Sequence, residues 1–166
     1  YNEPVFPLSQ LENMVRNGLK KVFPCASSRK EKMEQQTKLD KYGIEAISVI
    51  HPSATVSRAA TLGKGVFVGA GAKIGPAVSI GDFSVVLAGA SIAHHGKLGR
   101  FVAVSDGSHL GGNVVVDDGA EIGISAAVNK RVRIGGEVTV VSGATVVDDV
   151  PVGHVLRLDG MKVAKS

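Results

Sequence analysis

Residues 62–98 read LGKGVFVGAGAKIGPAVSIGDFSVVLAGASIAHHGKL, and an aliphatic residue returns in this stretch at every sixth position. The same step continues in both directions without an insertion. It meets eighteen residues from Ile50 to Val152, and each of them is Val, Ile or Leu. Since hydrophobic residues make up only 44% of the chain, chance does not explain the run. A short fixed period is the signature of a repeat architecture.

Two other positions of the hexad follow the same period. The residue two places before each aliphatic is never larger than Val, and the residue directly after it is Gly nine times. Glycine tolerates left-handed backbone conformations, so we interpret each hexad as a short strand followed by a tight corner. The aliphatic and the small residue point inward. Three hexads close a triangular coil, which predicts a mainly β protein, a parallel β-helix of about six coils.

The repeat divides the chain into three parts. Residues 50–152 form the predicted β-helix, and residues 153–166 form a tail that we expect to cover its last coil. Residues 1–49 lack the hexad and predict a small, incomplete α/β module, either a cap for the first coil or a truncated substrate domain. Its expected elements are a short helix with a capping box at Ser9 and Glu12, a strand over 19–26, a helix over 29–42 with a capping box at Ser28 and Glu31 and a stop at Gly43, and a strand over 44–50.

The composition narrows the classes of function. The net charge of +4 includes no basic block, so we expect no nucleic-acid partner. No apolar run is long enough to span a bilayer, so we expect no membrane insertion. The single Cys25 fits a reducing compartment and no secretory signal opens the sequence, so we expect a cytoplasmic protein. The opening residue, Tyr1 rather than Met, suggests a fragment of a longer chain.

The titratable side chains best suited to chemistry lie in one corner, at His94 and His95. A histidine is the natural base near neutral pH, and an exposed glycine N–H can donate to a developing oxyanion. Lys130, Arg131 and Arg133, about one coil further on, could hold phosphates, so the corner predicts an acyl transfer site for a phosphorylated acyl carrier. Corner residues stack every eighteen positions: Pro76, His94, Gly112 and Lys130 form one column, and Ala77, His95, Asn113 and Arg131 the next.

Two alternatives stay open at this point. Two adjacent histidines on a surface can be solvated corner residues without a catalytic role. A metal site needs a third ligand, and His109 stacks over Ser91 instead of over either histidine, so we expect no metal within one chain.

The corner SIAHH at 91–95, followed by LGRFV at 98–102, resembles a known family. The sequence looks like the bacterial hexapeptide-repeat sugar acyltransferases with a left-handed β-helix. It is closest to the branch that holds the sialic-acid O-acetyltransferases and the UDP-4-amino-sugar N-acetyltransferases. The resemblance extends over nearly the whole chain from Val5, with further matches at VIHPSA (49–54), GGNV (111–114) and GIS (123–125).

The resemblance implies an acetyl-CoA-dependent homotrimer with active sites between subunits. It implies that His94 is the general base, that the Gly112 amide faces the thioester oxygen, and that Ile124 and Ser142 contact the arm of CoA. The chain departs from the family at three places. His95 stands where the family has Asp or Glu, Ala103 stands where it has a second histidine near the thioester, and the sugar-nucleotide half of the N-terminal domain, with its Gly-rich turn, is missing.

The leading hypothesis is therefore an acetyl-CoA-dependent acetyltransferase that acts on an amino or hydroxyl group of a sugar, which we expect to be nucleotide-linked. Lys130 and Arg131 are predicted to meet the phosphates of CoA. Outward hydrophobic residues at Phe67, Val85 and Val115 predict a homotrimer with parallel axes. The alternatives are a catalytically inactive β-helix scaffold and a metal-dependent hydratase of the carbonic anhydrase type.

Overall fold

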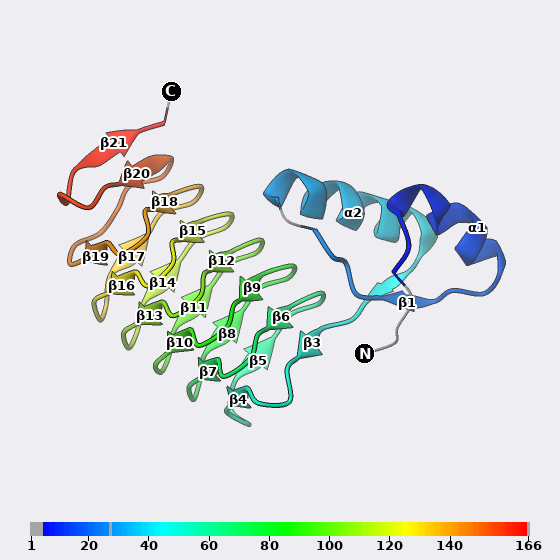
Figure 1. Ribbon diagram of the computed structural model, residues 1–166, viewed down its shortest axis with the longest axis horizontal. Coiled ribbons are helices and arrows are strands. Elements are labelled where there is room, and N and C mark those ends of the chain that lie inside the picture. Colours follow the sequence, from blue (N-terminus) through cyan, green and yellow to red (C-terminus); the bar gives the residue numbers. More distant parts are fainter. Residues whose placement is uncertain (1–4, 27, 166) are drawn as a thin grey trace. The chain divides into compact units, whose positions relative to one another are not determined.

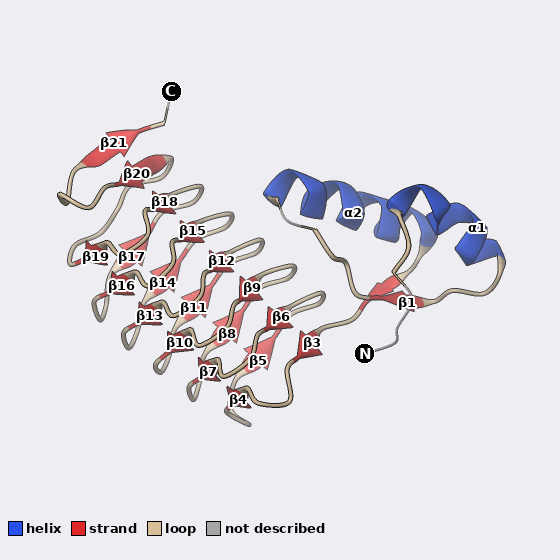
Figure 2. Cartoon of the chain, viewed as in Figure 1, coloured by secondary structure: helices blue, strands red, loops and turns tan. Residues whose placement is uncertain are grey.

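The computed structural model describes residues 5–26 and 28–165. The chain divides into two compact units, Tyr1–Ile47 and Ser48–Ser166. The first unit contains all the α-helix of the described residues, and the second is built almost entirely of short strands (Figure 2). None of the helices in the described ranges has the length and apolar character needed to cross a membrane.

The first unit is a small α/β module. Its two strands pair in parallel, with Lys21 opposite Glu45 and Val22 opposite Ala46. An ion pair of 2.8 Å joins Lys21 and Glu45 across this pair. The elements in chain order are the 3-10 helix η1 (Leu8–Gln10), α1 (Leu11–Arg16), β1 (Lys21–Val22), α2 (Arg29–Tyr42) and β2 (Glu45–Ala46).

The two predicted capping boxes have different outcomes. At α2 the prediction is confirmed: Ser28 Oγ accepts from the Glu31 amide, and the Glu31 carboxylate accepts from the Ser28 amide. Gly43 ends α2 in the left-handed conformation, as predicted. At Ser9 the prediction is wrong, because α1 begins two residues later, after Gln10, with no side-chain cap. Glu12 pairs instead with Arg16, one turn further along the same helix, at 2.9 Å.

The predicted strands of the first unit are shorter than expected. The strand over 19–26 is reduced to Lys21–Val22, and the strand over 44–50 is divided into β2 and β3 (Val49–Ile50). The reason is that the two pieces have different partners. β1 and β2 bond to each other, whereas β3 belongs to the second unit and bonds there to β6 (Phe67–Val68).

The second unit is a parallel β-helix with three sheets, in which each strand bonds to strands one coil before and after it (Figure 1). The first sheet holds β3, β6 (Phe67–Val68), β9 (Val85–Val86), β12 (Ala103–Val104), β15 (Glu121–Ile122) and β18 (Thr139–Val140). The second sheet holds β4 (Thr55–Val56), β7 (Lys73–Ile74), β10 (Ser91–Ile92), β13 (His109–Leu110), β16 (Ala127–Val128) and β19 (Thr145–Val146). The third sheet holds β5 (Thr61–Leu62), β8 (Ser79–Ile80), β11 (Lys97–Leu98), β14 (Val115–Val116) and β17 (Arg133–Ile134).

The predicted interior is confirmed over most of its length. The second residue of each strand from Val68 to Val146 is buried, and so is the small residue two places before it. At the two ends of the array the prediction is wrong. Ile50 is 44% exposed and Val152 is 67% exposed. Ile50 is exposed because it lies on the first coil, which has no coil before it. Val152 is exposed because the third sheet ends just before it, with the single bridge between Ile134 and Val150.

The glycine that follows each aliphatic has a different role from the one predicted. From Gly65 to Gly143 the left-handed residue of the corner lies three places after the aliphatic, as at Ala77, His95 and Arg131. The glycine directly after the aliphatic is required by close approach of the next coil. A Cβ on Gly75 would lie 1.3 Å from the carbonyl oxygen of Ala93. The corner is therefore tight because successive coils stack against it.

The C-terminal tail completes the β-helix with a short hairpin. β20 (His154–Leu156) pairs in parallel with β18 and extends the first sheet by one strand. β21 (Lys162–Ala164) then pairs antiparallel with β20. The Lys165 ammonium donates to the carbonyl of Glu137 at 2.5 Å, so the end of the tail is attached to the last coils.

Candidate active site

The two histidines of the corner lie between β10 and β11 and contact each other. The Nδ1 atoms of His94 and His95 are 3.1 Å apart, and the rings meet edge to face with their centroids 5.3 Å apart. His95 adopts the left-handed conformation of the corner, with φ of 55°, which histidine accepts more readily than most residues. The corner backbone therefore directs both rings outward and side by side.

A hydrogen bond between two Nδ1 atoms fixes the tautomers of the pair. One ring must donate its Nδ1–H and the other must accept with a bare Nδ1. When His94 is the donor, its proton lies on Nδ1 and its Nε2 carries a free lone pair. His94 is then a base directed away from His95.

Gly112 provides the surface against which the His94 ring lies. A Cβ at position 112 would lie 2.5 Å from His94 Cε1 and 2.6 Å from His94 Nε2. Any side chain at position 112 would therefore displace the imidazole, so the corner needs glycine here for space. The backbone fixes the stacking, because the Asn113 amide donates to the His94 carbonyl at 2.8 Å.

The amide of Gly112 has no partner on the next coil of the described chain. At the same position of other corners, those that follow third-sheet strands, an aspartate eighteen residues further on accepts from the amide. Asp82 accepts from Lys64 and Asp118 accepts from Arg100, both at 2.8 Å. The residue eighteen places after Gly112 is Lys130, which has no acceptor in its side chain. In the described part of the chain the Gly112 N–H has no acceptor.

Lys130 and Arg131 stack one coil beyond Gly112, as the columns predict. The Arg131 amide donates to the Gly112 carbonyl at 2.9 Å. Both side chains are exposed, and neither forms an ion pair or hydrogen bond with another described residue. They are two exposed positive charges on the side of Gly112 that faces away from His94.

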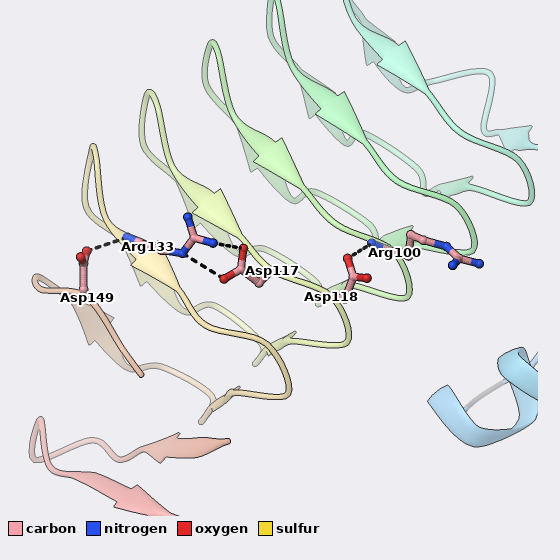
Figure 3. A network of polar contacts seen from close by, with 5 residues as sticks. All are labelled: Arg100, Asp117, Asp118, Arg133 and Asp149. Carbon is pink, nitrogen blue, oxygen red and sulfur yellow. Dashed lines mark hydrogen bonds and ion pairs between the residues drawn. The ribbon is translucent and has the colours of Figure 1, made fainter. Parts of the chain in front are cut away.

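Arg133, by contrast, is not a free cation. Its guanidinium makes a two-pronged contact with Asp117, at 3.0 Å from Nε and 2.8 Å from the terminal nitrogen. Its amide donates to Asp149 at 2.7 Å. Figure 3 shows this network and, on an earlier coil, the Arg100 amide donating to Asp118. The prediction that Arg133 could hold a phosphate is therefore not supported, because its charge is already paired.

The remaining predicted cofactor residues lie elsewhere on the prism. Ala103 is the outward residue of β12 in the first sheet, and Ile124 and Ser142 occupy the corner between the first and second sheets. Both corner residues are exposed, Ile124 by 54%. The histidine corner joins the second sheet to the third. One chain therefore does not bring Ala103, Ile124 and Ser142 together with His94 and Gly112.

The metal alternative finds no ligand set within a chain. Among residues 5–26 and 28–165 no cluster of three His, Cys, Asp or Glu side chains could hold an ion. His109 bonds instead to Ser91, with Nδ1 2.8 Å from the serine Oγ. This contact follows from the strand register, which places Ser91 opposite His109.

The sequence analysis missed a groove next to the histidine corner. It is open, holds about 500 Å³, and runs along β4, β7 and β10 of the second sheet up to Ala93, the residue before His94. A signal for it exists in the sequence, since polar residues take the outward position of this sheet at four successive eighteen-residue steps: Thr55, Lys73, Ser91 and His109.

Comparison with known proteins identifies relatives by structure. No family model and no curated protein matches the chain. A mutant GDP-perosamine N-acetyltransferase from Caulobacter crescentus, solved with CoA and GDP-perosamine, is 29% identical over 95% of this chain and 76% of its own, with a TM-score of 0.91. The acetyltransferase domain of PglB from Neisseria gonorrhoeae, solved with acetyl coenzyme A, is 32% identical over 74% of this chain and 60% of its own, with a TM-score of 0.73. WeeI from Acinetobacter baumannii shares the fold at 21% identity, with a TM-score of 0.79.

The fold is the one that the hexapeptide-repeat acetyltransferases among these neighbours share. The resemblance to the bacterial sugar acyltransferases is confirmed, because the structural neighbours are sugar N-acetyltransferases with the same β-helix.

Proposed function

We propose that this protein transfers the acetyl group of acetyl-CoA to an amino or hydroxyl group of a nucleotide-linked sugar. The observation that carries the proposal is the His94 imidazole lying against Gly112, whose amide has no acceptor in the described chain. A base and an oxyanion donor are then adjacent, as acyl transfer requires. Neighbours solved with acetyl coenzyme A, or with CoA and GDP-perosamine, support both substrates.

The reaction follows from the two groups of the corner. The lone pair of the acceptor amine or hydroxyl attacks the thioester carbon. His94 Nε2 takes the proton of the acceptor during this attack. The Gly112 N–H donates to the oxyanion of the tetrahedral intermediate. When the carbon–sulfur bond breaks, the CoA thiolate leaves and recovers the proton from His94. The products are the acetylated sugar and CoA, and His94 returns to its neutral form.

His95 has the part that a carboxylate plays in the family. It orients His94 through the Nδ1 contact of 3.1 Å. Unlike an ionised carboxylate, it can also be the donor of the bond. The pair works as a base only in the arrangement in which His94 keeps its proton on Nδ1.

The placement of the predicted CoA residues favours a site shared between subunits. His94, Gly112, Lys130 and Arg131 lie on one corner of the prism, and Ala103, Ile124 and Ser142 lie on or near another. A second chain can present the latter group to the former. We therefore propose a homotrimer in which each site uses two chains. Phe67 and Val85, outward on the first sheet, would pack in this interface, whereas Val115 lies on the third sheet. A reducing compartment such as the cytoplasm fits the free, exposed Cys25.

The test is a transfer assay combined with a binding measurement. The purified protein is given acetyl-CoA with GDP-perosamine and with UDP-linked 4-amino sugars, and free CoA thiol is followed. Changing Lys130 and Arg131 together to Ala should weaken CoA binding in calorimetry, and wild-type affinity should fall as salt rises. Lys64→Ala combined with Arg58→Ala is the matched control, because it removes the same charges from distant coils. Unchanged affinity in the first variant would place the phosphate site elsewhere. Binding of CoA without turnover on any sugar would favour the alternative, an inactive scaffold.

A further inference from the structure

The outward face of the second sheet carries a row of polar side chains beside the histidine corner. The strand register places Lys73 next to Ser91, and Ser91 next to His109. The imidazole of His109 holds the Ser91 hydroxyl at 2.8 Å. The Lys73 side chain is exposed, and no ion pair or hydrogen bond occupies it in the described chain.

Lys73 and Ser91 of this row line the open groove. The polar lining consists of Thr55, Ser57, Lys73 and Ser91. The apolar lining includes Pro76 and Ala93, both exposed. The groove surface is mostly apolar, and the hydroxyls and the Lys73 ammonium are its few polar groups. Such a surface suits the C–H face of a sugar ring that bears a phosphate.

The groove and the cations lie on opposite sides of the base. Along the corner, the Pro76 carbonyl accepts from the His95 amide, the His94 carbonyl accepts from the Asn113 amide, and the Gly112 carbonyl accepts from the Arg131 amide. The groove spans the two coils before the histidines and their own coil, and Gly112 and the cations follow on the next two coils. An acyl donor held by Lys130 and Arg131 over Gly112 leaves the Pro76 side of His94 open for the acceptor.

We propose that this groove is the acceptor subsite, and that Lys73 binds the phosphate or diphosphate of a sugar nucleotide while Ser91, oriented by His109, bonds a hydroxyl of the sugar. The proposal rests on the proposed function, because it gives the binding site of the acceptor that a transferase needs. His109 is a positioning residue, since it does not line the groove. Specificity for a phosphorylated acceptor then comes from the β-helix itself.

The first test uses Lys73→Ala with Lys97→Ala as its control. Both lysines are exposed, and each is the outward residue of its strand, but Lys97 lies on the third sheet, on the other side of the corner. With GDP-perosamine and saturating acetyl-CoA, Lys73→Ala should raise the acceptor KM by about tenfold, the loss expected for one charge-assisted contact. Lys97→Ala should leave the KM unchanged. CoA affinity should stay the same in both variants.

A second arm distinguishes the phosphate from the rest of the acceptor. With a free 4-amino sugar that lacks phosphate, Lys73→Ala and the wild type should have equal kcat/KM. With GDP-linked and UDP-linked sugars the loss should be the same, because the contact is with phosphate and not with the base. A Lys73→Ala effect of equal size on the unphosphorylated sugar would overturn the assignment of Lys73.

The hydroxyl is tested by Ser91→Ala, with Ser79→Ala as its control on the third sheet. Ser91→Ala should raise the acceptor KM several-fold, and Ser79→Ala should not. His109→Ala should resemble Ser91→Ala in KM, and the double variant Ser91→Ala with His109→Ala should be no worse than Ser91→Ala alone. Additive losses in the double variant would contradict a positioning role for His109.

Equilibrium binding separates the failure of this proposal from the failure of the proposed function. If no sugar is acetylated, calorimetry with GDP-perosamine is run on the wild type and the two lysine variants. If the wild type and Lys97→Ala bind GDP-perosamine and Lys73→Ala binds it about tenfold more weakly, the groove remains the proposed sugar-nucleotide site. The acetyltransferase function would then be rejected. Equal binding by all three, or no binding by the wild type, would overturn the groove.

Discussion

At the scale of single residues, the corner depends on three positions that have little freedom. His95 takes a left-handed backbone, His94 meets it through Nδ1, and Gly112 leaves room for the His94 ring. The two histidines contribute different things, since only His94 lies against the free amide. Replacing either one should therefore give a distinct result.

His94→Ala should lower kcat by ~10²–10⁴-fold, the usual contribution of a positioned base. CoA affinity should hardly change, because the ring acts on the acceptor proton. The measurement is single-turnover acetyl transfer together with CoA calorimetry. His51→Ala is the control, since His51 lies on the first coil, far along the chain from the corner. Equal turnover in wild type and His94→Ala would end the catalytic interpretation of the corner.

His95→Glu should raise kcat at neutral pH, or restore turnover if the natural protein lacks it. A carboxylate accepts but never donates when ionised, so it would hold the His94 proton on Nδ1, and its charge would stabilise the imidazolium that forms during transfer. His95→Gln is the matched control without charge, and it should be less active than His95→Glu. A kcat for His95→Glu below that of His95→Gln would show that the partner does not act through charge.

At the scale of the element, the hexad assigns one role to each position. The second residue of each strand and the small residue before the strand fill the interior, and the first residue of the strand faces outward. The small position has no spare volume, because Ala72, Ala90 and Ala126 are completely buried in the described chain. Size at this position should therefore control stability.

Ala90→Leu should lower the free energy of unfolding by ~1–3 kcal/mol, the usual effect of overpacking a well-packed core. Ala127→Leu is the control, since Ala127 faces outward as the first residue of β16. Both proteins are compared by urea denaturation at constant pH and salt. If the two substitutions have the same effect, the interior at Ala90 is looser than the burial indicates.

At the scale of the whole molecule, the residues predicted for CoA lie on or near two corners of one prism. The histidine corner follows the second sheet, and the corner with Ile124 and Ser142 follows the first. Since corners of a rigid prism do not meet, a site that uses both needs a second copy of the chain. Assembly and activity should then be inseparable.

Light scattering at micromolar concentration should give three times the chain mass of 17.1 kDa. Co-expression of His94→Ala with Ile124→Glu, each inactive alone, should restore part of the activity. The restored sites take His94 from one chain and Ile124 from the next. His94→Ala mixed with Gly112→Ala should restore nothing, because both changes affect the same corner. A monomeric mass, or equal rescue in the two mixtures, would contradict a shared site.

The sequence by itself determined the periodic and local features. The six-residue step fixed the inward positions from Val68 to Val146, because every coil repeats the same environment. The capping box of Ser28 and Glu31 was predictable because its two bonds join residues three apart. The column of His94, Gly112 and Lys130 was predictable from the repeat, because three hexads make one coil and residues eighteen apart therefore stack.

Only the tertiary structure decided how neighbouring coils use these positions. It moved the left-handed residue to His95, and it showed that Gly75 is needed because the Ala93 carbonyl lies above it. It paired Arg133 with Asp117, and it joined His94 to His95 through Nδ1. It also separated Ile124 from the histidine corner. These outcomes depend on side-chain rotamers and on contacts between coils about sixteen to eighteen residues apart. The six-residue repeat predicts which residues stack, but it does not predict which of their atoms are in contact.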